Sequence, residues 1–286
     1  LTDVPYIAGF TAEIAPQWLD LVAVINGFTP PRRDRGFHWC ELGCGPGMAP
    51  IVFAATHPEG VFHAVDAMPD HIGHGRRIAE SAGLGNLTFH ALDFAAAPDL
   101  DLPKFQYIVA HGVYAWIDEA AAASLCGFID RHLAPGGLVY VSYNAMPGWA
   151  ADHPFQHLVY ALAEHQDGDS IARFAAATAV TDRMMKAGAA ALTMSPISSK
   201  LEEQKAKQAK AYFAHEYLAP AWRPRYVDDV RREMAAIGLA PVGSATLRDN
   251  FDNFVLRKAA REALAEIDDP DRRELTRDYF MFPRFR

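Results

Sequence analysis

The sequence has few cysteines and no long apolar run. Its three cysteines, Cys40, Cys44 and Cys126, cannot all pair with one another, which is typical of a reducing, cytoplasmic setting. The longest apolar candidate, 189–197, is interrupted by a Ser-Pro pair and falls short of the ~20 residues that cross a bilayer. Residues 1–10 have neither a basic start nor an apolar run, so no signal peptide is expected.

Positive charge is also in deficit. Lys and Arg number 27 against 35 Asp and Glu, which gives a formal net charge of −8. A basic face that holds nucleic acid is therefore not expected. Half of the 286 residues are hydrophobic and 22% are charged, so the chain can bury a core, and its length suits one large domain or two smaller ones.

From Gly36 onward, short apolar runs alternate with helical stretches. The predicted strands are 37–42, 61–67, 87–93, 105–110 and 138–143. The predicted helices between them are 48–56, 70–82 and 118–133. Strands that alternate with helices at this spacing predict an α/β fold with a Rossmann-like, mostly parallel sheet.

The pattern further divides the chain into five predicted parts. Helical periodicity dominates between the fifth predicted strand and the next apolar runs, which predicts a helical insertion before the last strands. The parts are an N-terminal helical cap (1–35), the Rossmann-like core (36–150), a helical insertion expected to act as a lid (151–225), a helix with closing strands at 239–247 and 254–257 (226–260), and a helical tail expected to link to a further C-terminal region (261–286).

A glycine-rich loop joins the first predicted strand to the first helix. Glu41 precedes Gly43, Gly45 and Gly47, and this strand–loop–helix context is the one that a ligand-cradling loop requires. Glycines allow a positive φ and a close backbone approach, and a helix N-terminus attracts an anionic group. A dinucleotide-binding loop needs a third glycine where Met48 stands, which disfavours a nicotinamide oxidoreductase.

Two more acids follow the next strands. Asp66 lies about 20 residues beyond the glycines, the spacing of an acid that accepts hydrogen bonds from ribose hydroxyls. Asp93 ends the third predicted strand beside Phe94. Each acid alone is as readily a turn residue, but three acids at successive strand ends predict a ligand site at that edge.

The acid-x-Gly-x-Gly-x-Gly spacing resembles motif I of the class I S-adenosylmethionine-dependent methyltransferases. Two further strings, HGVYAW (111–116) and SYNAMPGW (142–149), follow the fourth and fifth predicted strands. With AHEYL (214–218) and YVDDV (226–230), they resemble bacterial methyltransferases that carry a methyltransferase regulatory domain, a group that includes rickettsial protein-lysine methyltransferases.

This resemblance implies S-adenosylmethionine as cofactor and S-adenosylhomocysteine as product. It implies that Asp93 accepts a hydrogen bond from the adenine amino group and that the leading segment with Tyr6 packs near the cofactor. The implied cofactor-binding residues are Tyr6, Glu41, Gly43, Cys44, Gly45, Gly47, Asp66, Ala67, Met68, Asp93, Phe94 and His111.

The catalytic candidates are His111, Tyr114, Tyr143 and Asn144. Methyl transfer is an in-line displacement, so the protein mainly aligns the nucleophile and excludes water. The two tyrosines, with Trp116 and Trp149, are expected to form an aromatic wall that tolerates a sulfonium, although aromatic residues at strand ends are as often core. His111 would accept a proton or hold the cofactor, and Asn144 would orient an amine.

The function expected is S-adenosylmethionine-dependent methyl transfer to a protein lysine amine. The alternatives are a non-catalytic S-adenosylmethionine-binding regulatory protein and a small-molecule methyltransferase. The partner is a protein or small-molecule methyl acceptor, with no nucleic acid and no membrane. A metal at His38, Cys40 and Cys44 is disfavoured because no second cysteine pair exists, and His71 and His74 are interpreted as surface residues.

Overall fold

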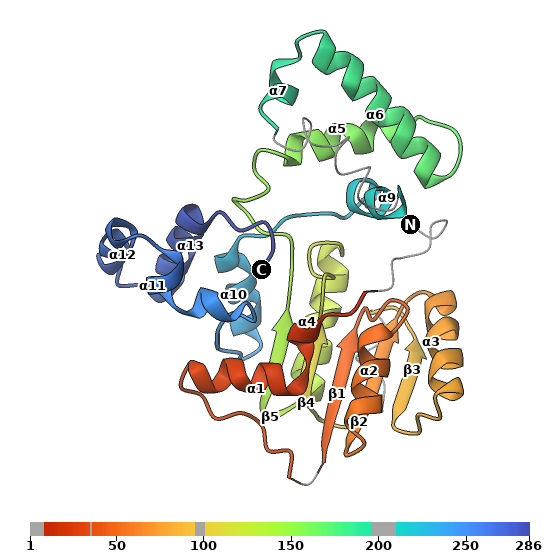
Figure 1. The fold of residues 1–286 in the computed structure, drawn as a ribbon, viewed down its shortest axis with the longest axis vertical. Coiled ribbons are helices and arrows are strands. Elements are labelled where there is room, and N and C mark those ends of the chain that lie inside the picture. Colours follow the sequence, from red (N-terminus) through yellow and green to blue (C-terminus); the bar gives the residue numbers. More distant parts are fainter. Residues whose placement is uncertain (1–8, 35, 95–100, 196–209) are drawn as a thin grey trace. The chain divides into compact units, whose positions relative to one another are not determined.

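The computed structural model describes residues 9–34, 36–94, 101–195 and 210–286 (Figure 1). The chain forms two compact units. One contains Gly148–Trp222, and the other combines Ala8–Pro147 with Arg223–Arg286. The second unit therefore holds the predicted Rossmann-like core together with the C-terminal segment.

The core is a sheet in which every pair of neighbouring strands is parallel. Its order is β3-β2-β1-β4-β5. The strands are β1 (Phe37–Leu42), β2 (Gly60–Asp66), β3 (Leu87–Ala91), β4 (Phe105–Ala110) and β5 (Leu133–Val141). The predicted α/β class is confirmed. The strand order reverses between β1 and β4, and in sheets of this kind ligands bind at the carboxyl ends of the strands beside such a reversal.

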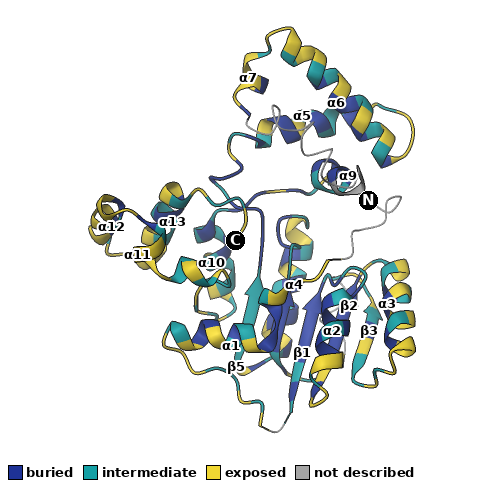
Figure 2. Cartoon of the chain, viewed as in Figure 1, coloured by how far each residue is buried: buried dark blue, intermediate teal, exposed yellow. Residues whose placement is uncertain are grey.

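Both faces of the sheet are covered, as Figure 2 shows by the dark colour of its central strands. Trp39, Phe62 and Tyr107 face a core built with η1 (Ala12–Ile14), α1 (Pro16–Ile25) and α2 (Met48–Thr56). Cys40, Leu42 and Ile108 alternate with them and pack on α4 (Glu119–His132). Each fully buried large side chain stabilises the fold by about 1.5–3 kcal/mol, which explains the near-continuous apolar strands.

The helices around the sheet begin and end close to the predicted positions. α3 spans Pro69–Ser81, and its first residue is a proline, whose missing N–H costs nothing there. α4 begins after Asp118, whose side chain accepts a hydrogen bond from the backbone N–H of Ala121 at 2.8 Å. Capping residues in the sequence therefore locate these helices to within a residue or two.

The described part of Gly148–Trp222 is helical. Its elements are α5 (His153–Ala163), α6 (Ser170–Lys186), α7 (Ala190–Thr193) and α9 (Lys210–Leu218). Phe155, Val159, Phe174 and Tyr217 form its own core, and Asp169 caps α6 by accepting from the N–H of Ala172. This unit therefore has an apolar core separate from those of the sheet.

The C-terminal segment contains α10 (Val227–Ala236), η3 (Leu247–Asn250), α11 (Asp252–Val255), α12 (Lys258–Ala265) and α13 (Pro270–Met281). The predicted closing strands at 239–247 and 254–257 are wrong: 239–246 is irregular, and 254–257 lies at the end of α11 and beyond it. The Asn250 side chain explains the first error, because it accepts from Ser244 N–H and donates to the carbonyls of Ser244 and Leu247 in place of a strand partner.

The segment expected to be a linker is folded. Tyr143 N–H donates to Arg286 O at 2.8 Å, and Ala145 N–H donates to Arg284 O at 2.9 Å. The residues after α13 therefore pair with the chain that follows β5. Among the described residues, no helix is long and apolar enough to cross a membrane.

Candidate functional site

The glycine loop after β1 has the backbone that its sequence predicts. Gly43, Gly45 and Gly47 have φ angles of 76°, 53° and 80°, in the left-handed region that favours glycine. A Cβ on Gly43 would lie 2.4 Å from Val113 Cγ2, and one on Gly47 would lie 2.5 Å from Phe89 Cε1. The close approach at these two glycines thus comes from the protein's own side chains, which shape the loop from both sides.

Asp66 ends β2 and organises this loop. Its Oδ2 accepts from the N–H of Gly45 at 2.9 Å, and its Oδ1 accepts from the N–H of Met68 at 2.9 Å. His71 Nδ1 lies 3.2 Å from the same Oδ1. The interpretation of His71 as a plain surface residue is wrong, since its side chain is only 16% exposed and lies against the buried Asp66.

Glu41 is a buried acid on β1, directly before the loop. It is 5% exposed, and among the described residues its Oε2 has no hydrogen-bond partner. Burial, reinforced by the charge of Asp66, raises the pKa of Glu41 well above its ordinary value. An unpartnered buried carboxyl is costly, so this position fits a ligand that brings a cationic or N–H donor group.

The other predicted cofactor residues lie at the ends of β1, β2 and β3. Cys44 is buried in the loop, with its Sγ 3.5 Å from Gly45 O. Ala67 and Asp93 are exposed, and Phe94 packs against the core cluster that contains Leu42. The structure thus brings these predicted residues to one edge of the sheet, whereas Tyr6 lies outside the described residues.

His111 follows β4 and is enclosed by hydroxyl groups. Its Nδ1 lies 3.0 Å from Tyr140 OH and 3.2 Å from Ser142 Oγ, and its Nε2 lies 3.2 Å from Thr11 Oγ1. Burial lowers the pKa of His111, although the carboxylate of Glu13 opposes that shift. The imidazole is therefore neutral near pH 7. Two of its neighbours, Thr11 and Tyr140, are not among the residues that the sequence pointed to.

The remaining catalytic candidates are buried and engaged by the C-terminal segment. Tyr114 is 1% exposed and donates its hydroxyl to Glu233 of α10. Burial raises the pKa of Tyr143 to about 12, and the neighbouring Arg286 opposes this shift. Asn144 is buried, and its backbone carbonyl accepts a hydrogen bond from the backbone N–H of Arg225 at 2.9 Å. The two tyrosines thus face partners in the fold instead of an open aromatic wall.

The register of the predicted strands could have indicated one neighbour of His111 that the sequence analysis missed, Tyr140. Tyr140 pairs with Val109, which pairs with Glu41, so Tyr140 and Glu41 share a sheet face. Thr11 and Glu13 precede α1, and no local pattern ties them to His111. Glu233 has no signal either, because the whole insertion separates its helix from Tyr114 along the chain.

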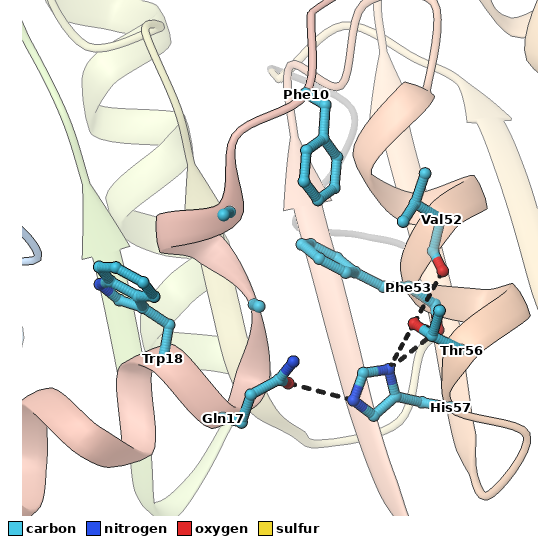
Figure 3. A pocket seen from close by; sticks show the side chains of 9 residues that line it. Phe10, Gln17, Trp18, Val52, Phe53, Thr56 and His57 are labelled. Carbon is cyan, nitrogen blue, oxygen red and sulfur yellow. Dashed lines mark hydrogen bonds between the residues drawn. The ribbon is translucent and has the colours of Figure 1, made fainter.

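A separate hollow of about 440 Å³ lies beside α2 (Figure 3). Phe10, Trp18 and Phe53 line it, with Thr56 and His57 at its polar end. His57 Nε2 lies 3.1 Å from the Gln17 side-chain oxygen. The polar end sits at the C-terminal end of α2, opposite the glycine loop, so this hollow is distinct from the strand-end site. Within the described ranges, no three His, Cys, Asp or Glu side chains gather as a metal ion would need.

Strand order, glycine loop and strand-end acids together define the class I methyltransferase fold. Residues 33–207 match the family described as "Methyltransferase domain", and residues 209–286 match the "Predicted methyltransferase regulatory domain". The chain therefore belongs to the methyltransferase domain family and carries the associated regulatory domain, as the motifs predicted.

Relatives extend this finding. An uncharacterized protein of Synechocystis is 35% identical over 284 residues, which cover 99% of this chain and 56% of that protein. An uncharacterized protein of Rickettsia prowazekii is 29% identical over 159 residues, which cover 55% of this chain and 62% of that protein. The structure of PKMT2 from Rickettsia typhi in complex with AdoHcy matches with a TM-score of 0.79 and 24% identity, covering 99% of this chain and 54% of that one. The chain thus spans about half the length of the Synechocystis protein and of PKMT2.

Proposed function

We propose that this protein transfers a methyl group from S-adenosylmethionine to a protein lysine amine and releases S-adenosylhomocysteine. The observation that carries the cofactor assignment is the pair of buried acids, Glu41 and Asp66, on either side of a loop of left-handed glycines. When bound, S-adenosylmethionine supplies an activated methyl group on a cationic sulfur. PKMT2, which shares this fold, was solved with AdoHcy, and this supports the assignment.

Each acid has a distinct task in this proposal. Glu41 holds the positive end of the cofactor, since its Oε2 is buried and has no hydrogen-bond partner among the described residues. Asp66 receives a ribose hydroxyl. A carboxylate offers about four acceptor sites, and Gly45, Met68 and His71 already use three of those on Asp66. One ribose hydroxyl therefore fits directly, and a second requires His71 to move.

The remaining cofactor contacts follow the strand ends. Asp93 and Phe94 would hold the adenine, with Ala67 and Met68 beside the ribose and Cys44 in the loop. Gly43, Gly45 and Gly47 would let the cofactor approach the backbone of the loop closely. Their own N–H groups already donate to Val65 O, Asp66 Oδ2 and Cys44 O. Tyr6 is proposed as a further cofactor contact on the family resemblance alone.

The acceptor side centres on the residues after β4 and β5. A lysine must lose its proton before attack, and a desolvated site favours the neutral amine. His111, whose pKa is lowered by burial and raised by the carboxylate of Glu13, would receive or relay that proton. Asn144 would orient the amine, while Tyr114 and Tyr143 would support the segments after β4 and β5 from within the fold. The net charge of −8 argues against a nucleic-acid acceptor.

The setting proposed is the cytoplasm. Cys40, Cys44 and Cys126 are all free thiols, as a reducing compartment maintains them. A small-molecule methyltransferase would use the same cofactor site with a different acceptor. A non-catalytic regulatory protein would bind S-adenosylmethionine at this site without transferring its methyl group.

A labelling experiment separates these functions. The protein is incubated with tritiated S-adenosylmethionine and a lysate of its source, and the counts are tested for protease sensitivity and for stability in alkali. Lysine methylation predicts counts that are protease-sensitive and survive alkali. Protease-resistant counts indicate a small molecule, and alkali-labile counts indicate a carboxyl ester. Binding without any transfer, shown by calorimetry with S-adenosylhomocysteine, would contradict the enzymatic assignment.

A further inference from the structure

The loop that follows β4 is held by the regulatory domain. Tyr114 donates its hydroxyl to Glu233 Oε2 at 2.5 Å. The other carboxylate oxygen of Glu233 forms an ion pair with Arg225. The guanidinium carbon of Arg225 in turn lies 5.2 Å from the centroid of the Tyr114 ring. These three side chains form a closed set, named here the Tyr114–Glu233–Arg225 triad.

Two members of the triad are withdrawn from solvent, whereas the Glu233 side chain between them is 39% exposed. Tyr114 and Arg225 are 1% and 5% exposed. Burial, followed by the hydrogen bond to Glu233, raises the pKa of Tyr114 well above its ordinary value, so the phenol stays protonated and donates. A buried guanidinium requires a charged partner, and loss of that partner is strongly unfavourable. Glu233 therefore holds both Tyr114 and Arg225 in place.

Backbone pairing ties the same segment to both strand-end loops. Arg223 N–H donates to Ala115 O at 2.7 Å, in the loop after β4. Arg225 N–H donates to Asn144 O, and Arg225 O accepts from Met146 N–H, each at 2.9 Å, in the segment after β5. The first residues of the regulatory module within this unit thus run between the two loops that carry the catalytic candidates.

On its other side, the β4 loop contacts the glycine loop. Val113 is next to Tyr114 in the chain, and its Cγ2 occupies the space that a Cβ on Gly43 would need, 2.4 Å away. The order of contacts is therefore Gly43, Val113, Tyr114 and Glu233. Packed interiors transmit displacements because they contain few voids.

We propose that Glu233 is a positioning residue through which the regulatory domain sets the cofactor site. By holding Tyr114, it fixes Val113 against Gly43 and keeps the glycine loop in its binding conformation. The inference rests on the proposed function, and it gives Tyr114 a positioning role in place of a wall around the acceptor.

The test uses the full chain with Glu233→Gln, Tyr114→Phe and the double variant. Affinity for S-adenosylhomocysteine is measured by calorimetry, and kcat and KM are measured for methyl transfer. Each single variant is expected to weaken affinity about tenfold, the scale of a lost hydrogen bond to a charged group. The double variant is expected to lose no more than Glu233→Gln alone, because Tyr114→Phe removes one of the two contacts that Glu233 makes. Glu119→Gln is the matched control, since it removes the exposed carboxylate that pairs with Arg223 and should change neither quantity.

Three results would overturn the proposal. The first is unchanged affinity and turnover in both single variants. The second is additive loss in the double variant, which would mean independent structural effects. The third is loss of kcat in Tyr114→Phe with normal affinity while Glu233→Gln is normal, which would return Tyr114 to the acceptor. If Tyr114→Phe does not fold, a cycle of Glu233→Gln and Arg225→Lys tests the other contact of Glu233, its ion pair with Arg225. A wild-type protein that binds S-adenosylhomocysteine without transfer refutes the proposed function, while the affinity cycle still tests the triad.

Discussion

The carboxylate of Asp66 accepts a hydrogen bond from the backbone N–H of Gly45, 2.9 Å away. This contact joins the end of β2 to the loop that follows β1. The acid proposed to hold the ribose therefore also holds the glycine loop, so binding and local stability depend on the same side chain.

Asp66→Ala is expected to weaken S-adenosylhomocysteine binding by about 1.5–3 kcal/mol through loss of a charge-assisted hydrogen bond. The N–H groups of Gly45 and Met68 also lose their acceptor, so the free energy of unfolding should fall by about 1–3 kcal/mol. Calorimetry and urea unfolding measure the two effects. Asp70→Asn, on the exposed first turn of α3, is the control, and normal binding in a folded Asp66→Ala protein would remove Asp66 from the site.

Gly47→Ala should be more damaging than an ordinary glycine substitution. The new Cβ would lie 2.5 Å from Phe89 Cε1 at a φ of +80°, so steric overlap adds to backbone strain. We expect a loss of about 2–4 kcal/mol in the free energy of unfolding. Gly83→Ala has a φ of +68° with open space around the new Cβ, so it measures the backbone cost alone. Equal losses in the two variants would contradict the overlap with Phe89.

Asn144→Ala is expected to reduce kcat more than cofactor affinity, because its proposed contact is with the acceptor amine. Tyr143→Phe is the neighbouring comparison. Its phenol lies beside Arg286, so its loss should lower the free energy of unfolding by about 1 kcal/mol and leave kcat nearly unchanged. Steady-state kinetics and urea unfolding distinguish the two. A larger drop in kcat for Tyr143→Phe than for Asn144→Ala would reverse their roles.

His63 makes stability depend on pH. Its Nδ1 lies 3.0 Å from His90 Nε2, and burial, with smaller effects of His90 and His38, lowers the pKa of His63 to about 4. Between pH 6.5 and 4 the unfolded chain binds a proton here that the folded chain does not. The free energy of unfolding should therefore decrease by about 3 kcal/mol from this group as the pH is lowered from 6.5 to 4. His63→Val should flatten the decline measured by urea unfolding at several pH values, whereas the exposed His74→Gln should not.

Asp278 on α13 has the opposite dependence. Burial raises its pKa to about 6, although Arg286 lies 3.2 Å from its Oδ1. Between pH 4 and 6 the folded protein holds a proton on Asp278 that the unfolded chain releases. The stabilisation from this proton, about 3 kcal/mol, is complete below pH 4 and is lost as the pH rises to 6. Asp278→Asn should remove that loss. Asp271→Asn, an exposed partner of Arg231, is the matched control, and identical pH profiles for wild type and Asp278→Asn would refute the assignment.

Most of the sheet could be predicted because its signals are local. The strand at 105–110 and the helix at 48–56 occur at their predicted bounds, since apolar runs, glycines and caps act on neighbouring residues. The runs near 239–247 and 254–257 misled because apolar residues alone do not supply a strand partner. Asn250 bonds backbone groups of Ser244 and Leu247 in the first run, and the second run begins in the last two residues of α11 and continues beyond it.

The amino-acid sequence by itself determined the α/β fold, the glycine loop, the acids at its edge and the family, because fixed spacing along the chain carries all of them. Only the tertiary structure decided which partners these residues meet. His71 lies against Asp66, Tyr143 lies beside Arg286, and Tyr114 binds Glu233. These contacts follow from the fold and not from any local pattern. The last two residues are 119 positions apart, and no periodicity reports which side chains meet across such a distance. Because of these long-range contacts, the predicted aromatic wall is instead a connection between the loop after β4 and the regulatory domain.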